Sequence, residues 1–136
     1  MIQTATDNLT EYYATVQSMG KILTPEQARL WSRSVLNLMG INMSRSAKSA
    51  LAKALPEALG SELKRVFWLL HFRNTNVTLA EFQENVARRS GHMDKNFAKV
   101  PITAVFHALK QLIPNDVSSK VADDLSPELR KLWQHA

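Results

Sequence analysis

The chain has 136 residues, of which 45% are hydrophobic and 21% are charged. These values fit one folded domain with a core of its own and argue against a disordered chain. There is no cysteine, which excludes disulfides and thiolate metal sites, and the net charge of +5 is mildly basic, which permits an anionic partner.

Helix start and stop signals recur along the chain, and apolar residues repeat at helical spacing between them. Capping boxes are expected at residues 8–11, 24–27 and 78–81, and Ser-Pro-Glu at 126–128 repeats the start chemistry. Glycines at positions 20, 40, 60 and 91 predict helix ends, and Pro101 either begins its helix late or kinks it. The predicted helices lie near 8–19, 25–39, 45–55, 61–70, 79–89, 98–113, 116–125 and 127–134. No stretch alternates convincingly as a strand, so the predicted fold class is all-α.

The sequence repeats itself. An offset of 70 positions aligns most of the first half with the second, including Leu51 with Val121 and Leu55 with Leu125. Near the end the offset changes to 66, which aligns residues 62–65 with 128–131 and leaves about four extra residues in the first copy. This pattern predicts a single domain, residues 1–136, of two pseudo-symmetric repeats of about four helices each, at about 4–70 and 78–136, linked by 71–77.

The apolar stripes of these helices predict the core. Trp31, Trp68 and Trp133 are expected to be core anchors rather than binding residues. The predicted core comprises Tyr12, Val16, Trp31, Val35, Leu38, Leu51, Leu55, Leu63, Phe82, Val86, Val105, Leu109, Leu112, Val121, Leu125, Leu129 and Trp133.

Two strings resemble a known family: T-L-A-E-F-Q-E-N-V-A-R-R-S-G at 78–91, and the amphipathic segment L-I-P-N-D-V-S-S-K-V-A-D-D-L-S-P-E-L-R-K-L-W at 112–133. They are similar to the duplicated unit of the bacterial family known as domain of unknown function 2267. The first copy is more divergent, with Tyr12 in place of the family's Phe. The resemblance implies an all-α fold, and it carries over no catalytic positions because the family has no assigned activity.

No catalytic motif is assembled in the sequence. Residues 90–94 hold Ser, His and Asp, but five consecutive residues past a helix end are poorly placed for a triad, so they are expected to form a polar turn. The four histidines have no metal-binding spacing, and no Gly-rich phosphate loop is present. Asp123 and Asp124 are expected to lie on a solvated helix face. We therefore expect no enzyme activity and no cofactor, although a cleft between the repeats could still hold a small ligand.

A charge asymmetry departs from the repeat. Residues 27–56 contain no acidic residue, whereas the equivalent part of the second copy carries Asp116, Asp123 and Asp124. The candidate partner-binding residues are Arg29, Arg33, Arg45, Lys48 and Lys53. They can form a solvated surface without a role, a docking surface for an acidic protein or another copy of this chain, or a set of phosphate contacts on nucleic acid.

Taken together, these patterns predict a non-catalytic protein-interaction module, with nucleic-acid binding as the alternative and a small-ligand carrier or enzyme with a cleft between the repeats as the third possibility. The longest apolar run, residues 66–70, is far shorter than the roughly 20 residues that a membrane-spanning helix needs. The first residues show no signal-peptide pattern, so the expected location is the cytoplasm.

Overall fold

The computed structural model describes residues 2–65, 76–91 and 94–136. Within them the chain forms eight α-helices and one 3-10 helix and contains no strand, which confirms the all-α prediction. The elements are α1 (Ile2–Met19), α2 (Pro25–Asn42), α3 (Arg45–Ala54), α4 (Glu57–Lys64), α5 (Leu79–Arg89), η2 (Lys95–Ala98), α6 (Lys99–Leu112), α7 (Asn115–Asp124) and α8 (Pro127–His135). None of these helices is both long and apolar enough to cross a membrane.

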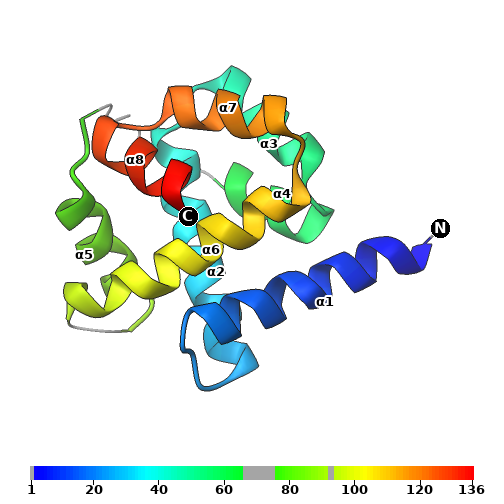
Figure 1. Ribbon diagram of the computed structural model, residues 1–136, viewed down its shortest axis with the longest axis horizontal. Helices are drawn as coiled ribbons and strands as arrows, with labels where there is room; N and C mark the ends of the chain where they lie inside the picture. Colours follow the sequence, from blue (N-terminus) through cyan, green and yellow to red (C-terminus); the bar gives the residue numbers. More distant parts are fainter. Residues whose placement is uncertain (1, 66–75, 92–93) are drawn as a thin grey trace.

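The helices α2 and α6 run through the centre of the molecule, and the others pack around them (Figure 1). The helix α1 packs along α6 and α2, and its first turns extend away from the body (Figure 1). On the opposite side, α3 lies between α4 and α7, and α7 in turn contacts α8.

Two of the predicted start signals form caps. The amide of Glu81 donates to the Thr78 hydroxyl oxygen at 3.1 Å, and the Thr78 amide donates back to the Glu81 carboxylate at 3.4 Å, which completes a capping box. At the start of α2, the Thr24 hydroxyl accepts from the Gln27 amide at 3.2 Å, and proline takes the first helical position.

Of the other two start signals, the one at Asn8 is wrong, and the one at Ser126 gives the correct helix start without a side-chain cap. Asn8 lies inside α1, because the helix already begins at Ile2. The backbone amides that an Asn8 cap would serve are bonded to carbonyls of the preceding helical turn. Ser126 is the N-cap residue of α8 and Pro127 takes the first helical position, as predicted. The Ser126 hydroxyl makes no cap hydrogen bond and donates instead to the carbonyl of Val77 at 2.7 Å. Ser126 therefore ties the start of α8 to the segment before α5.

The glycines divide into two kinds. Gly20 and Gly91 follow the ends of α1 and α5, as predicted. Gly40 and Gly60 lie inside α2 and α4, so the prediction of helix ends at these two positions is wrong. At each of them, the backbone of a neighbouring helix occupies the space that a side chain would need, and glycine leaves that space free. Pro101 lies in the first turn of α6, where its missing N–H removes no hydrogen bond.

Several helix bounds, including two near the end of the chain, differ by the repeat offset of 70. The bounds of α3 and α7 differ by 70 positions at both ends, and so do the starts of α4 and α8. The offset of 66 is therefore wrong: Glu62 lies near the end of α4, whereas Glu128 lies in the first turn of α8. The helix predicted over 61–70 instead begins at Glu57, and its residues 66–70 lie outside the described part. The pseudo-symmetry of the two halves stays a prediction.

One hydrophobic core joins both halves of the chain. All the predicted core residues are buried except Leu112, which is half-buried at the end of α6. Trp68 lies outside the described residues. Phe106, which the prediction missed, packs edge-on against Trp133 with 5.2 Å between ring centroids, and the Phe82 ring centroid lies 6.3 Å from that of Phe106. Aromatic packing therefore connects α5, α6 and α8.

Candidate functional site: an apolar groove between α2 and α6

A groove of about 510 Å³ lies where the turn between α1 and α2 faces the start of α6. One wall consists of residues 20–23 with Gln27 and Trp31 of α2. The other wall consists of Asp94 with residues 96–97 and 100–101, from η2 and the first turn of α6. The groove thus takes residues from both predicted repeats, and most of its lining side chains are apolar.

Large hydrophobic residues surround this groove and remain exposed. Leu23 is 87% exposed, Phe97 is 69% exposed and Val100 is 43% exposed, and all three line the groove. Met19, at 42%, is the remaining large hydrophobic residue that is exposed in the described part, and it directly precedes the lining residue Gly20. Exposed apolar side chains gathered in one place are typical of binding sites, whereas single ones are ordinary.

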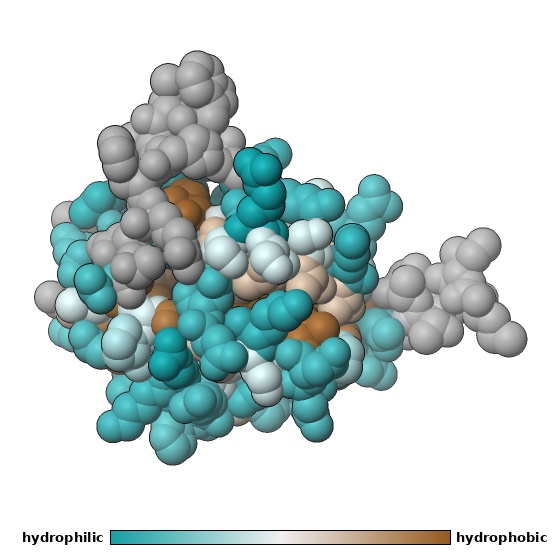
Figure 2. All heavy atoms as spheres, turned by 90° about the horizontal axis from the view of Figure 1, so that it is seen from above, coloured by the Kyte–Doolittle hydropathy of each residue, from teal (hydrophilic) through white to brown (hydrophobic). Residues whose placement is uncertain are grey.

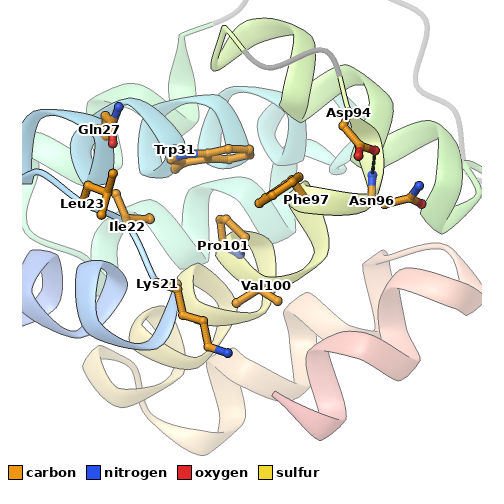
Figure 3. A pocket seen from close by; sticks show the side chains of 11 residues that line it. Lys21, Ile22, Leu23, Gln27, Trp31, Asp94, Asn96, Phe97, Val100 and Pro101 are labelled. Carbon is orange, nitrogen blue, oxygen red and sulfur yellow. Dashed lines mark hydrogen bonds between the residues drawn. The ribbon is translucent and has the colours of Figure 1, made fainter.

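In Figure 3 the Trp31 ring forms the inner wall, with Ile22 and Leu23 at one end and Phe97 towards the other. Val100 and Pro101 lie along the opposite side. The Lys21 side chain extends from the rim away from the groove interior (Figure 3). Trp31 itself is only 3% exposed, so it is a core residue whose ring edge also lines the groove.

The first wall is held by the end of α1. The amide of Ile22 donates to the carbonyl of Gln17 at 2.9 Å, and Lys21 takes a left-handed backbone conformation with φ of 54°. The side-chain amide of Gln17 donates to the Leu23 carbonyl at 3.3 Å. These bonds fix the turn and hold Leu23 out in solvent, although its position before the Thr24 cap predicts a hydrophobic staple on α2.

The second wall is held by a cap on η2. The Asp94 carboxylate accepts from the Asn96 amide at 2.9 Å, and the Phe97 amide donates to the Asp94 carbonyl at 3.2 Å (Figure 3). The Phe97 side chain consequently projects from a short, fixed turn. Both walls are therefore formed before anything binds.

Asp94 and Ser90 serve structural roles. The Ser90 hydroxyl is buried and donates to the Ser34 hydroxyl at 3.0 Å, so it links the end of α5 to α2. His92 lies outside the described residues. Among the residues that are described, no three His, Asp or Glu side chains come together in a way that could hold a metal ion.

The candidate basic residues belong to two helices with different surroundings. On α2, the Arg29 guanidinium lies 5.7 Å from the ring centroid of Tyr13, and Arg33 Nε lies 3.7 Å from a carboxylate oxygen of Glu62. Burial, and to a smaller extent the Glu62 carboxylate, raise the pKa of Tyr13, while the two arginines lower it. Arg29 and Arg33 thus already contact neighbouring helices.

The other three basic residues lie on α3. Arg45 and Lys53 are exposed, whereas Lys48 is half-buried, and burial together with the nearby Arg45 charge lowers the pKa of Lys48. The acidic helix α7 packs against α3, and the Ser44 amide at the start of α3 donates to the Asp124 carboxylate at 2.6 Å. Asp124 is therefore not on a solvated face as predicted, whereas its neighbour Asp123 is exposed.

Seen from above Figure 1, the side that carries α3 and α7 is largely hydrophilic, with small hydrophobic patches between the polar side chains (Figure 2). Part of the charge asymmetry between the two halves of the sequence thus serves a contact within the molecule, because the Asp124 carboxylate of α7 accepts a hydrogen bond at the start of α3. Sequence reasoning found these charges but did not find the groove. The sequence signal for the groove is weak. Leu23 and Phe97 are apolar residues near caps, and at the offset of 70 Phe97 aligns with the polar Gln27, so the two copies share no apolar pattern at that position.

The described part of the chain is thus a small all-helical protein with one hydrophobic core and an apolar groove between the α1–α2 turn and the start of α6. The model of the family described as "Uncharacterized conserved protein (DUF2267)" matches residues 10–132, from α1 to α8, and the chain belongs to that family. None of the curated proteins matches the sequence.

Proposed function

We propose that this protein is a non-catalytic protein-interaction module and that the groove between α2 and α6 is its docking site. The observation that supports this proposal is the gathering of Leu23, Phe97 and Val100, all exposed, around one pre-formed groove. Such a patch favours association with another surface, because covering it removes apolar area from water.

The expected gain is sufficient for a specific contact. Full burial of a leucine or phenylalanine side chain contributes roughly 1.5–3 kcal/mol, so covering Leu23 and Phe97 contributes roughly 3–6 kcal/mol before the costs of association. The walls are already hydrogen-bonded in place, which lowers the ordering cost on this side of the contact.

The basic residues have a second role in this proposal. Arg45 and Lys53 are exposed and would steer an acidic partner towards the protein, which raises the association rate more than the affinity. Arg29, Arg33 and Lys48 are less suited to this role, because each of them already contacts or is partly covered by neighbouring helices.

The test compares the wild-type protein with a Leu23→Ser/Phe97→Ser variant, both immobilised and exposed to nuclease-treated cell extract. Proteins that bind the wild type and are lost from the variant are then purified, and their affinities are measured by titration calorimetry. Ala58→Ser, an exposed substitution on α4 outside the groove, is the matched control. An identical set of bound proteins on wild type and groove variant would reject the groove as the docking site.

Nucleic-acid binding is the second candidate function. It is favoured by the closeness of Arg45 and Lys48, three positions apart on α3, where burial and, after it, the Arg45 charge lower the pKa of Lys48. A polyanion would relieve this repulsion. The candidate predicts an affinity for DNA or RNA that falls steeply with salt and is weakened by Arg45→Glu/Lys53→Glu. An affinity that does not change between low and high salt would reject it.

A small-ligand carrier is the third candidate, and the volume of the groove lies within the range of small-molecule pockets. We place it below docking of a protein because the groove is open enough to leave Leu23 and Phe97 mostly exposed. A small molecule released from the purified protein on denaturation, and absent from the Leu23→Ser/Phe97→Ser variant, would favour this third candidate instead.

A further inference from the structure

We propose that the groove receives the apolar face of an acidic amphipathic helix from a partner protein. This inference rests on the proposed function and specifies the chemistry of the partner. It follows from three properties of the groove: a mostly apolar lining, no sheet edge beside it among the described residues, and a rim cation, Lys21, that pairs with no carboxylate of those residues.

The apolar lining favours a helix over an extended peptide. An extended peptide needs partners for its own backbone N–H and C=O groups, and peptides of this kind usually add a strand to a sheet edge. No strand exists in residues 2–65, 76–91 and 94–136, and the uncharged lining side chains that carry polar groups are those of Gln27 and Asn96 and the indole of Trp31. A helix satisfies its backbone internally and offers apolar side chains at every third or fourth position, so it needs only apolar contacts.

The rim charge favours an acidic partner. Lys21 lines the groove, is exposed, and its ammonium group pairs with no carboxylate among the described residues. Asp94 is the one acidic residue in the lining, and its carboxylate already accepts the Asn96 amide in the cap of η2. Beside the lining, Lys99 precedes Val100 and Glu26 precedes Gln27, and both are exposed, so these two charges offset each other. The charge argument therefore rests on Lys21 and on the net charge of +5 of the whole chain, to which a carboxylate on the partner helix is complementary.

The groove also has a suitable form. Its ends are marked by the two most exposed apolar side chains, Leu23 on one wall and Phe97 on the other, and the Trp31 ring lies between them (Figure 3). An apolar side chain of the partner that enters between Leu23 and Phe97 would contact the Trp31 ring. The two outer residues would then cover the flanks of the partner helix.

The experiment starts from a displayed library of random 16-residue peptides, selected on the immobilised full-length protein and counter-selected on the Leu23→Ser/Phe97→Ser variant. Selected peptides are synthesised with a fluorescent label in three forms: the selected sequence, a form with Glu and Asp replaced by Lys, and a form with a central proline. Fluorescence anisotropy then gives the affinities for the wild type, the groove variant and Lys21→Glu. Thermal melting of each variant checks that it remains folded.

We expect selected peptides with apolar residues at helical spacing and flanking acidic residues. The groove variant should weaken their binding by about tenfold or more, as for residues at the centre of an interface. The central proline should weaken it by a similar factor, because it breaks the helix. Lys21→Glu should weaken the acidic peptide about threefold to tenfold and should strengthen the lysine form relative to the wild type.

Three results would overturn this inference. Groove-dependent peptides that tolerate the proline, or that prefer lysine to glutamate, would reject the acidic helix while leaving the docking function in place. A dimer in sedimentation experiments that is lost in the groove variant would assign the groove to a second copy of the chain. No groove-dependent peptide, combined with identical extract proteins on wild type and groove variant, would reject the inference and the proposed function together.

Discussion

Gly40 of α2 lies directly against the backbone carbonyl of Leu63 in α4. A Cβ atom added at position 40 would overlap that carbonyl oxygen, so the two helices can approach this closely only because residue 40 has no side chain. On the other side of α4, Gly60 approaches the Ala52 carbonyl of α3, where an added Cβ would lie 2.9 Å from the oxygen.

We expect Gly40→Ala to destabilise the protein by about 1–3 kcal/mol, because the overlap is with backbone and forces α4 away from α2. Gly60→Ala should cost less, because the overlap is smaller and alanine favours the helix. Urea unfolding of both variants and the wild type measures the difference. A Gly40→Ala variant as stable as Gly60→Ala would contradict this account of the α2–α4 contact.

The stability of the protein should fall above about pH 10 through Tyr12. Its hydroxyl is buried and lies 2.6 Å from the Ser32 hydroxyl, and burial raises its pKa well above the usual value. The unfolded chain then loses this proton at a lower pH than the folded chain. Stability is therefore fully present below about pH 10 and is lost above it, by up to about 1.4 kcal/mol per pH unit.

Urea unfolding between pH 8 and pH 11 gives the free energy of unfolding of the wild type and of Tyr12→Phe. The difference between the two pH dependences isolates the effect of Tyr12. Tyr12→Phe should flatten the fall, whereas Ser32→Ala should keep it because the phenol remains buried. An equal pH dependence in the wild type and Tyr12→Phe would show that other groups cause the alkaline loss.

Arg130 should stabilise the end of α7. Its Nε atom donates to the carbonyl of Ala122 at 2.8 Å, and one terminal nitrogen donates to the carbonyls of Asp123 and Leu125 at 3.2 and 3.3 Å. Arg130→Met should cost about 1–3 kcal/mol, because the carbonyls at a helix end lose a charged donor. Arg130→Lys should recover only part of this, since an ammonium group lacks the fork of donors.

Lys131→Met is the control for Arg130, because Lys131 is an exposed neighbour on the same helix. Thermal melting of the three variants gives the comparison. Equal melting temperatures for Arg130→Met and Lys131→Met would mean that the capping bonds contribute nothing.

Asp124 should join the two halves of the chain. We expect Asp124→Ala to cost about 1–3 kcal/mol, because it removes a charged acceptor from the Ser44 amide at the start of α3. The amide of Ser44 should then exchange its hydrogen faster. Asp123→Ala, one position earlier and exposed, should change neither quantity. Similar amide exchange in the two variants would argue against this contact.

The groove residues should be dispensable for folding. Leu23→Ser and Phe97→Ser should each change the free energy of unfolding by no more than about 0.5 kcal/mol, because both side chains are mostly exposed. Thermal melting of the single and double variants measures this. A large loss of stability would show that these side chains contribute to the core, and binding data from them would then need another variant.

The local signals of the sequence were sufficient for most helices. The capping box at Thr78 and Glu81 and the cap at Thr24 lie where they were predicted, since a cap involves only residues a few positions apart. The apolar stripes found the core for the same reason, as helical periodicity identifies the buried face. Asn8 shows the limit of this reasoning: the same residue types occur inside a helix when the preceding residues continue it.

The sequence alone thus determined the all-α class, the positions of most helices and the burial of nearly all the residues predicted for the core, because these depend on neighbours along the chain. The tertiary structure decided which distant surfaces meet. It placed Gly40 against Leu63 and brought the Asp124 carboxylate, which was expected to face solvent, into contact with the start of α3. It also left Leu23 and Phe97 outside the core. Each of these outcomes depends on the packing of helices far apart in the sequence, and capping and periodicity carry no information about that packing.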